Sequence, residues 1–481
     1  MNTSKKILTL LRDYESPNIL AIAPDLSAPM VWERARGVQV WDAAGRKYLD
    51  LTAAFGVAAA GHANRRVVAA GRRQMGVLLH AMGDVYPHAR KAELARELSR
   101  LTFERWTAAR PQKSRLPAQA PCDLPMPAPH EAGSGPGRWF RSIHGWRYQD
   151  APAQDSRLTG KTIFTNSGFE AVEAALKTAL LSTGRPRILA FTGGYHGLGY
   201  GALNATHRGH FRAPFRAQLG KFGSFAPFPK DDSDLPRLES AIRKLHQAAP
   251  FGAILAEPVQ ARGGIRVPPA GFLPLLRELC DRLGALLILD EIYTGFGRAG
   301  KWFACEHSAT VPDLICLGKA LTGGFPLSAC VGRADVMDAA WPRSTGEAIH
   351  TSTFLGHPVG CAMALAQIQE IRARRLPERS AALGAFFLRE LRAKTPPPPW
   401  QFEIRGLGLM AGVEIRQLDG APATEVALAV VRKMLRAGFI VLPEGEHSNV
   451  IGFTPPLTIT RAQLAAAAHA FHGALKNLDF R

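Results

Sequence analysis

The chain has 481 residues, 46% of them hydrophobic, which is enough for one large α/β domain with a smaller companion around an ample core. Its net charge of +19 is high, but arginines are scattered through every segment without interleaved aromatic residues. This favours a general composition bias over a nucleic-acid partner. No apolar run is long enough to span a membrane, so no membrane partner is expected.

The cysteines and the N-terminus both point to a cytoplasmic protein. No C-x-x-C pair is present, and several of the six cysteines lie in apolar runs, as expected for buried reduced thiols. They are Cys122, Cys280, Cys305, Cys316, Cys330 and Cys361. Charged residues interrupt the apolar stretch within residues 1–18, which therefore predicts a short helix and not a secretory signal.

The first third of the chain predicts an N-terminal arm and a proline-rich insertion. Residues 38–41 and 47–51 alternate around a turn signal and predict a hairpin, and residues 64–101 predict two helices. Residues 107–157 contain eight prolines, which predicts an insertion at the surface. We expect residues 1–60 to form the arm and part of a small domain.

From residue 161 the pattern becomes strand, glycine turn, helix. Short apolar strands are predicted at 162–165, 187–191, 253–256, 285–289, 314–317 and 328–331, with a helix at 272–283. Such strands with helical crossovers indicate a mainly parallel sheet covered by helices on both faces, in a large domain over residues 61–375. Ligands of these sheets bind at the carboxyl ends of the strands.

After residue 375 the pattern changes to that of a smaller α+β unit. It reads helix, strand, strand, helix, strand, strand, helix, with two strands around residues 405–408. We expect residues 376–481 to form a small C-terminal domain together with the N-terminal arm.

Lys319 carries the most informative chemistry. It follows the apolar strand 314–317, while Asp290 and Glu291 end the preceding strand. A desolvated lysine is nucleophilic and forms a Schiff base with an aldehyde, and a buried acid keeps a pyridine nitrogen protonated. The two strand ends therefore suit an enzyme that holds a pyridine aldehyde. No set of residues at metal-ligand spacing accompanies the acids, so a metal is not expected.

Four further motifs at strand ends are ambiguous when taken singly. Residues 165–170 predict either a phosphate-binding helix start or an ordinary N-cap turn. Tyr195 is either a stacking aromatic or a core residue. Residues 256–260 are either ring contacts or a capped loop, and the hydroxyls of residues 351–353 either donate to phosphate or cap the next helix.

In combination these motifs resemble the class III pyridoxal-phosphate aminotransferases, which belong to the fold type I group typified by aspartate aminotransferase. The resemblance runs from about residue 30 to 475 without the insertion, and residues 288–300 with 313–324 are its most specific part. It implies pyridoxal 5′-phosphate as cofactor and a homodimer with active sites at the interface. It also implies ping-pong transfer of an amino group by a Schiff-base mechanism.

The resemblance assigns roles to individual residues. Lys319 matches the Schiff-base lysine, which also moves the proton, and Asp290 matches the partner of the pyridine nitrogen. The remaining cofactor positions are Ser167, Gly168 and Phe169 at the phosphate, Tyr195 with His196 and Ile292 at the ring, Glu257 and Gln260 beside it, and Thr353 at the phosphate of the neighbouring subunit. The family usually has a small residue or Thr in place of Phe169, so a hydroxyl is lost there.

Two departures bear on the substrate. Gly452 stands where many family members carry an arginine for the substrate α-carboxylate, and Leu198 stands where an arginine often binds a distal carboxylate. Each loss removes a bidentate contact. Arg405 and Arg262 are the alternative carboxylate ligands, and Phe55 is expected to line an apolar pocket.

The sequence thus predicts an aminotransferase that moves an amino group from an ω-amino acid, amine or diamine to a 2-oxo acid, pyruvate or 2-oxoglutarate. One alternative keeps the fold and cofactor but changes the reaction to that of an aminomutase, decarboxylase, racemase or phospho-lyase. A remoter alternative is a binding protein without catalysis, against which the intact Lys319 and Asp290 argue.

Overall fold

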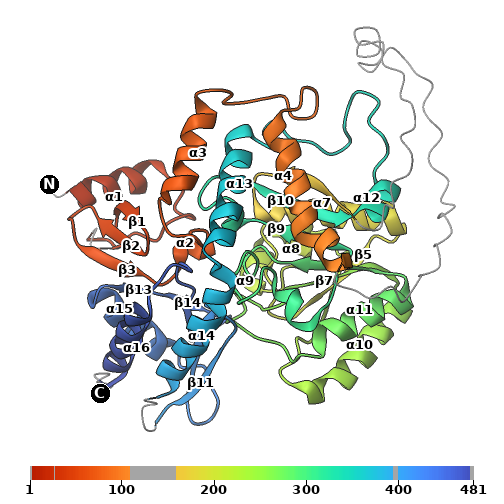
Figure 1. Ribbon diagram of the computed structural model, residues 1–481. Helices are drawn as coiled ribbons and strands as arrows, with labels where there is room; N and C mark the ends of the chain where they lie inside the picture. Colours follow the sequence, from red (N-terminus) through yellow and green to blue (C-terminus); the bar gives the residue numbers. More distant parts are fainter. Residues whose placement is uncertain (1–2, 26–27, 109–158, 394–398, 477–481) are drawn as a thin grey trace.

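The computed structural model describes residues 3–25, 28–108, 159–393 and 399–476 (Figure 1). The predicted insertion at 107–157 lies outside these residues, except for its first two, which end helix α5 (Arg105–Ala108). None of the helices in the described part is long and apolar enough to cross a membrane.

A seven-stranded sheet forms the centre of the larger part of the molecule. Its order is β4-β10-β9-β8-β7-β5-β6, and β10 is the strand that runs antiparallel to its neighbours. The mainly parallel α/β sheet is therefore confirmed. Strand β6, which had not been predicted, extends the edge beside β5. The strands are β4 (Gly160–Thr165), β5 (Arg187–Phe191), β6 (Gly223–Ala226), β7 (Phe251–Ala256), β8 (Leu286–Asp290), β9 (Leu314–Leu317) and β10 (Ser328–Arg333).

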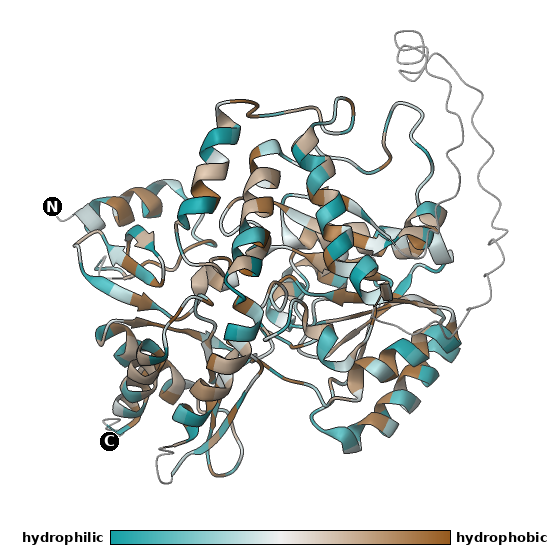
Figure 2. Ribbon diagram, in the orientation of Figure 1, coloured by the Kyte–Doolittle hydropathy of each residue, from teal (hydrophilic) through white to brown (hydrophobic). Residues whose placement is uncertain are grey.

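Helices cover both faces of this sheet because successive strand residues point to opposite sides. Ile254 and Leu287 belong to one hydrophobic cluster, and their neighbours Ala253 and Leu286 belong to another. The first cluster packs under α4 (Ala89–Ser99), α10 (Leu235–Ala248), α11 (Phe272–Leu283) and α13 (Pro358–Ala373); the second packs under α7 (Gly168–Thr183), α8 (Tyr200–Ala205) and α12 (Ala334–Ala340). The central strands are mostly brown in Figure 2, whereas α10 mixes teal and brown.

The N-terminal segment joins the C-terminal segment in one small sheet. The predicted hairpin forms, and its second strand pairs in parallel with β13, which places Leu49 opposite Phe439 (Figure 1). The elements are α1 (Thr3–Tyr14), β1 (Trp32–Arg36), β2 (Gln39–Asp42), β3 (Lys47–Asp50), α2 (Ala53–Gly56) and β13 (Phe439–Ile440). Helix α3 (Arg65–Met75) then leads into the large part and packs on α13.

The rest of the C-terminal segment is a second four-stranded sheet with the order β11-β12-β15-β14. Three short strands follow α15 where two were predicted, because β13 and β14 are split between the two small sheets. The elements are α14 (Leu376–Arg392), β11 (Gln401–Gly406), β12 (Ala411–Arg416), α15 (Thr424–Arg436), β14 (Leu442–Glu444), β15 (Val450–Phe453) and α16 (Arg461–Lys476). The domain boundaries at residues 60 and 375 stay predictions.

A buried arginine in the loop after β8 fastens the C-terminal segment to the large part, and a close backbone contact holds that segment together. Arg298 is fully buried and donates to the carbonyls of Leu409 and Pro455. On α14, a Cβ placed on Gly384 would lie 1.9 Å from the Gly408 carbonyl oxygen. No side chain fits that gap, so helix α14 depends on glycine at this position.

Replacement of Gly384 by Ala is therefore expected to destabilise the protein by about 3 kcal/mol or more, since it forces two backbone segments apart. Gly473→Ala is the matched control: this helical glycine is exposed and a Cβ there would meet nothing within 4 Å. It should stabilise α16 by roughly 0.5–1 kcal/mol. Thermal and urea unfolding would measure both changes, and equal midpoints for the two variants would contradict the packing argument.

Candidate active site

The carboxyl ends of β7, β8 and β9 open into a cavity of about 400 Å³. This is the edge at which parallel sheets bind their ligands. Most of the lining residues come from the motifs that the sequence singled out. They are Gly168, Phe169, Tyr195, His196, Gly197, Leu198, Glu257, Ala261, Arg262, Asp290, Ile292, Tyr293, Thr294 and Lys319.

Asp290, the last residue of β8, is buried and paired with a histidine. Its Oδ2 lies 2.8 Å from Nδ1 of His196, and its Oδ1 accepts a hydrogen bond from the Ile292 N–H at 3.1 Å. Burial lowers the pKa of His196, but the hydrogen bond and charge of Asp290 outweigh it, so that the pKa of the imidazole is raised. The pair is thus a buried carboxylate beside a histidine that favours its charged form.

Glu291, the next residue, has a different environment. Its carboxylate accepts hydrogen bonds from the N–H groups of Ala304 at 3.0 Å and Cys305 at 2.8 Å and from the Thr294 hydroxyl. Burial raises the pKa of Glu291 to about 7. Of the two consecutive acids, Asp290 faces the cavity, while Glu291 ties the following loop together.

Lys319 follows β9 and has a left-handed backbone with φ of 40°. Its Nζ lies 4.6 Å from the centroid of the Tyr293 ring. Burial lowers the pKa of the Lys319 amine, although the charges of Asp290 and Glu257 oppose that shift. A neutral amine at neutral pH is therefore favoured more than on an exposed lysine.

Glu257 and Tyr195 are joined across neighbouring loops. The two carboxylate oxygens of Glu257 accept hydrogen bonds from the N–H groups of Tyr195 at 2.9 Å and Ala261 at 3.0 Å. Burial raises the pKa of Glu257 to about 7. Gln260 is buried behind this loop and donates to the Thr192 carbonyl, so it supports the cavity without lining it.

The start of α7 closes one end of the cavity. Gly168 and Phe169 are its first residues, and their N–H groups have no acceptor within the helix. Ser167 precedes them, and its Oγ is buried without a hydrogen-bond partner among the described residues. Ile292 packs so closely on Gly168 that a Cβ there would lie 2.9 Å from its Cδ1. This end of the cavity offers hydrogen-bond donors to a ligand.

Besides Ser167 and Gln260, three predicted site residues lie outside the cavity lining. Phe55 and Thr353 are exposed, at 52% for Phe55. Arg405 uses Nη1 for Glu414 at 2.7 Å, and its other nitrogens donate to the Gly264 and Ile265 carbonyls. Arg405 therefore braces the loop after β7 and has no free edge for a carboxylate. Arg262 does line the cavity.

Sequence reasoning missed two residues near the cavity. Tyr293 lies in the motif already identified, and its hydroxyl hydrogen-bonds to Thr454 at 3.1 Å. Glu444 ends β14 and lies 3.2 Å from Arg262, closest between Oε2 and Nη1. Nothing in the sequence around Glu444 signals this contact, because it depends on how the C-terminal sheet meets the large one.

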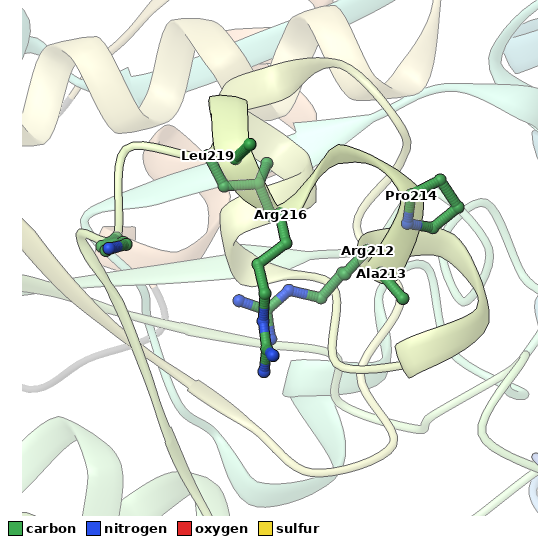
Figure 3. Close-up of a pocket in the computed structure, with 7 residues that line it drawn as sticks. Arg212, Ala213, Pro214, Arg216 and Leu219 are labelled. Carbon is green, nitrogen blue, oxygen red and sulfur yellow. The ribbon is translucent and has the colours of Figure 1, made fainter.

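A second hollow, of about 690 Å³, lies over residues 212–221. Figure 3 shows the guanidinium groups of Arg212 and Arg216 beside each other there. Lys221 adds a third basic residue, and the lining includes no acid or histidine. This hollow accounts for part of the positive surface but offers no acid–base chemistry.

The first cavity fits pyridoxal 5′-phosphate by the chemistry of its residues. The unpartnered Ser167 Oγ and the free N–H groups at the start of α7 suit a phosphate. The buried Asp290 suits a protonated ring nitrogen, and the amine of Lys319 suits an aldehyde. The three features lie around one cavity, as a single flat cofactor requires.

Comparison with known proteins agrees with this fit. The family described as Aminotransferase class-III matches residues 22–110 and 148–475. The chain is 34% identical over 450 residues to the 5-aminovalerate aminotransferase of Pseudomonas aeruginosa, covering 91% of each. It is 31% identical over 488 residues to the putrescine aminotransferase of Pectobacterium atrosepticum, covering 99% of this chain and 90% of that protein.

Solved structures are similar over the whole chain. An amine transaminase from an uncultivated Pseudomonas species, in its PLP-bound form, has a TM-score of 0.78 at 26% identity, with 100% of both chains covered. An (S)-enantioselective omega-transaminase from Thermomicrobium roseum has a TM-score of 0.79 at 27% identity and the same coverage. The sheets and helices described above are thus those of PLP fold type I, and the chain belongs to the class III aminotransferases, which are transaminases that use pyridoxal 5′-phosphate.

Proposed function

We propose that this aminotransferase moves an amino group from an ω-amino acid, amine or diamine to a 2-oxo acid, pyruvate or 2-oxoglutarate. The observation that carries the proposal is the combination of Lys319, Asp290 and Leu198 around one cavity, in a chain that also has Gly452 in place of an arginine. The names of the relatives support it, because they include a 5-aminovalerate, a putrescine and an amine transaminase.

Pyridoxal phosphate, when bound, supplies an aldehyde that takes the amino group and a ring that withdraws electrons. We assign Lys319 the covalent attachment of the cofactor and the transfer of the substrate proton at its Nζ. Asp290 would hold a proton on the ring nitrogen, and His196 orients Asp290 through the 2.8 Å contact. Glu257 holds Tyr195 in place beside the ring.

We assign the phosphate to the start of α7. Ser167 donates its hydroxyl and Gly168 and Phe169 donate their N–H groups. Ile292, which lies against Gly168, would contact the ring face, and Gln260 keeps the loop after Thr192 in position. Thr353 is exposed on its own chain, as a residue that serves a neighbouring subunit has to be.

We also propose a cytoplasmic homodimer with its active sites at the interface. Apolar side chains of residues 75–86 lie exposed next to residues 349–354, and the rings of His80 and Phe354 are 5.3 Å apart. Exposed apolar side chains gathered in this way mark an interface. Its members are Met75, Val77, Leu78, Leu79, Met82, Tyr86, Ile349 and Phe354. Five described cysteines are buried and unpaired, which suits a reducing compartment.

The substrate proposal predicts the outcome of a donor screen on the purified holoenzyme. Amines, diamines and ω-amino acids should give turnover with pyruvate or 2-oxoglutarate, measured as the amino acid formed. Lys319→Ala should give no turnover and serves as the blank. Activity restricted to α-amino acids would overturn the substrate class, and release of ammonia or CO₂ without an acceptor would overturn the transfer reaction.

Replacement by the corresponding amide should have different effects at Asp290 and at Glu291. Asp290→Asn is expected to lower kcat on the order of 10³-fold, since the ring nitrogen loses its charged partner. Glu291→Gln should keep kcat within about threefold but destabilise the protein by about 1–3 kcal/mol, because an amide leaves one of its donors unsatisfied. Kinetics and thermal unfolding separate the two effects. Similar losses of kcat in both variants would contradict the assignment.

The dimer proposal predicts that charge on the apolar patch separates the subunits. The double variant Val77→Glu, Leu79→Glu should sediment near the chain mass of 52.1 kDa, while the wild type sediments near twice that mass. Leu418→Glu is the control, because Leu418 is equally apolar and 62% exposed but lies outside the patch. A wild type that sediments as a monomer would exclude the interface.

A further inference from the structure

Arg262 and Glu444 meet at the end of the cavity that the C-terminal sheet covers. Glu444 is 5% exposed, and the side chain of Arg262 is 30% exposed and lines the cavity. In the described part of the chain, this is the one ion pair of Arg262. Glu444 is thus a buried carboxylate whose partner is open to an incoming substrate.

Glu444 also fills the space left by a missing side chain. Gly452 pairs with Leu442 across β14 and β15, and a Cβ on Gly452 would lie 3.0 Å from Cγ of Glu444. A side chain at position 452 would therefore require Glu444 to shift from its present position. In this chain the acidic Glu444 lies where an arginine at position 452 would have added a positive charge.

The two side chains attract each other by charge, without a well-formed hydrogen bond between them. Oε2 of Glu444 has no well-formed hydrogen bond, although Nη1 of Arg262 lies 3.2 Å from it. The backbones are joined instead by the Gly445 N–H, which donates to the Arg262 carbonyl at 3.2 Å. The loops are thus fixed to each other while the Arg262 side chain is free to exchange its partner.

Each member of this ion pair can be replaced by a substrate group of the same charge. A substrate carboxylate can replace Glu444 at Arg262, and a substrate ammonium can replace Arg262 at Glu444. The ammonium exchange keeps a positive charge at Glu444. When a substrate carboxylate takes Arg262, Glu444 loses its partner, and burial, which raises the pKa of Glu444, favours the neutral acid there. Arg208, which donates to the Glu446 carbonyl at 3.4 Å, adds positive charge at the same end.

We propose that Arg262 and Glu444 select substrates by the charge of their distal group. Arg262 binds the carboxylate of the 2-oxo acid and of ω-amino acids, and Glu444 binds the distal ammonium of a diamine donor. The proposal rests on the proposed function and narrows it to donors that include diamines. It makes Arg262 and Glu444 specificity residues, with no part in the proton transfer at Lys319.

The two halves of the ping-pong reaction test the pair separately. The cofactor absorbance is followed after mixing the pyridoxal-phosphate form with an amino donor, or the pyridoxamine-phosphate form with the 2-oxo acid. Glu444→Gln should raise KM for putrescine about tenfold or more, and should lower KM for 2-oxoglutarate or leave it unchanged. Arg262→Gln should raise KM for 2-oxoglutarate and 5-aminovalerate about tenfold or more and spare putrescine. Glu446→Gln is the control, with the same charge change on an exposed neighbour.

An ion pair with only a structural role would not produce opposite effects on the two substrate types. Equal losses in both half-reactions for both variants, or no loss in either, would overturn the proposal. Because Arg262→Gln leaves Glu444 buried alone, the double variant Arg262→Gln, Glu444→Gln is included; it should recover the wild-type melting temperature and lose both preferences.

Calorimetry with glutarate, which does not react, keeps this inference distinguishable from the proposed function. Arg262→Gln should weaken glutarate binding about tenfold and Glu444→Gln should strengthen it. If the wild type turns over none of the donors, the proposed function fails while the glutarate titration still decides on Arg262. Equal glutarate affinities in all variants would refute the pair even in an active enzyme.

Discussion

The buried carboxylate of Asp290 is the constraint on which the rest of the site depends. A charged group at the end of an apolar strand is costly unless partners surround it. His196, far away in sequence, provides one partner, and the Ile292 N–H provides another. The loop after β5 must therefore reach over to β8, and that crossing forms the wall on which Tyr195 and Glu257 meet.

Sheet order then places the chemical groups in sequence along one edge. Strands β7, β8 and β9 are neighbours, so the residues that follow them, Glu257, Asp290 and Lys319, are arranged side by side. Burial raises the pKa of Glu257 and lowers that of Lys319, which favours a neutral amine at Lys319. The same parallel sheet that stabilises the fold thus also buries the chemical groups of the site.

The sequence predicted most of this arrangement and failed at identifiable places. Apolar runs such as Leu314–Leu317 marked the central strands because both of their faces are buried. The edge strand Gly223–Ala226 was missed, since it is short, starts with glycine and has little apolar pattern. Within the site, residues next to strand ends were found because the motif and the strand end coincide.

Charges that meet across distant segments were not predictable in the same way. Arg405 and Arg262 were equivalent candidates in the sequence, and their difference lies in Glu414 and Glu444, which the C-terminal sheet delivers to them. Local patterns carry no information on such pairs, because the contact depends on the packing of two sheets. The proposed charge selection by Arg262 and Glu444 therefore depends on tertiary structure and could not be found from the motifs.

The central claim is that Lys319 is the residue to which the cofactor attaches. The direct measurement is borohydride reduction of the holoenzyme, digestion and mass spectrometry of the peptides. We expect a pyridoxyl phosphate group on Nζ of Lys319 in the wild type and no such group in the Lys319→Ala variant. A label on another lysine, or no label in protein saturated with pyridoxal phosphate, would contradict the account.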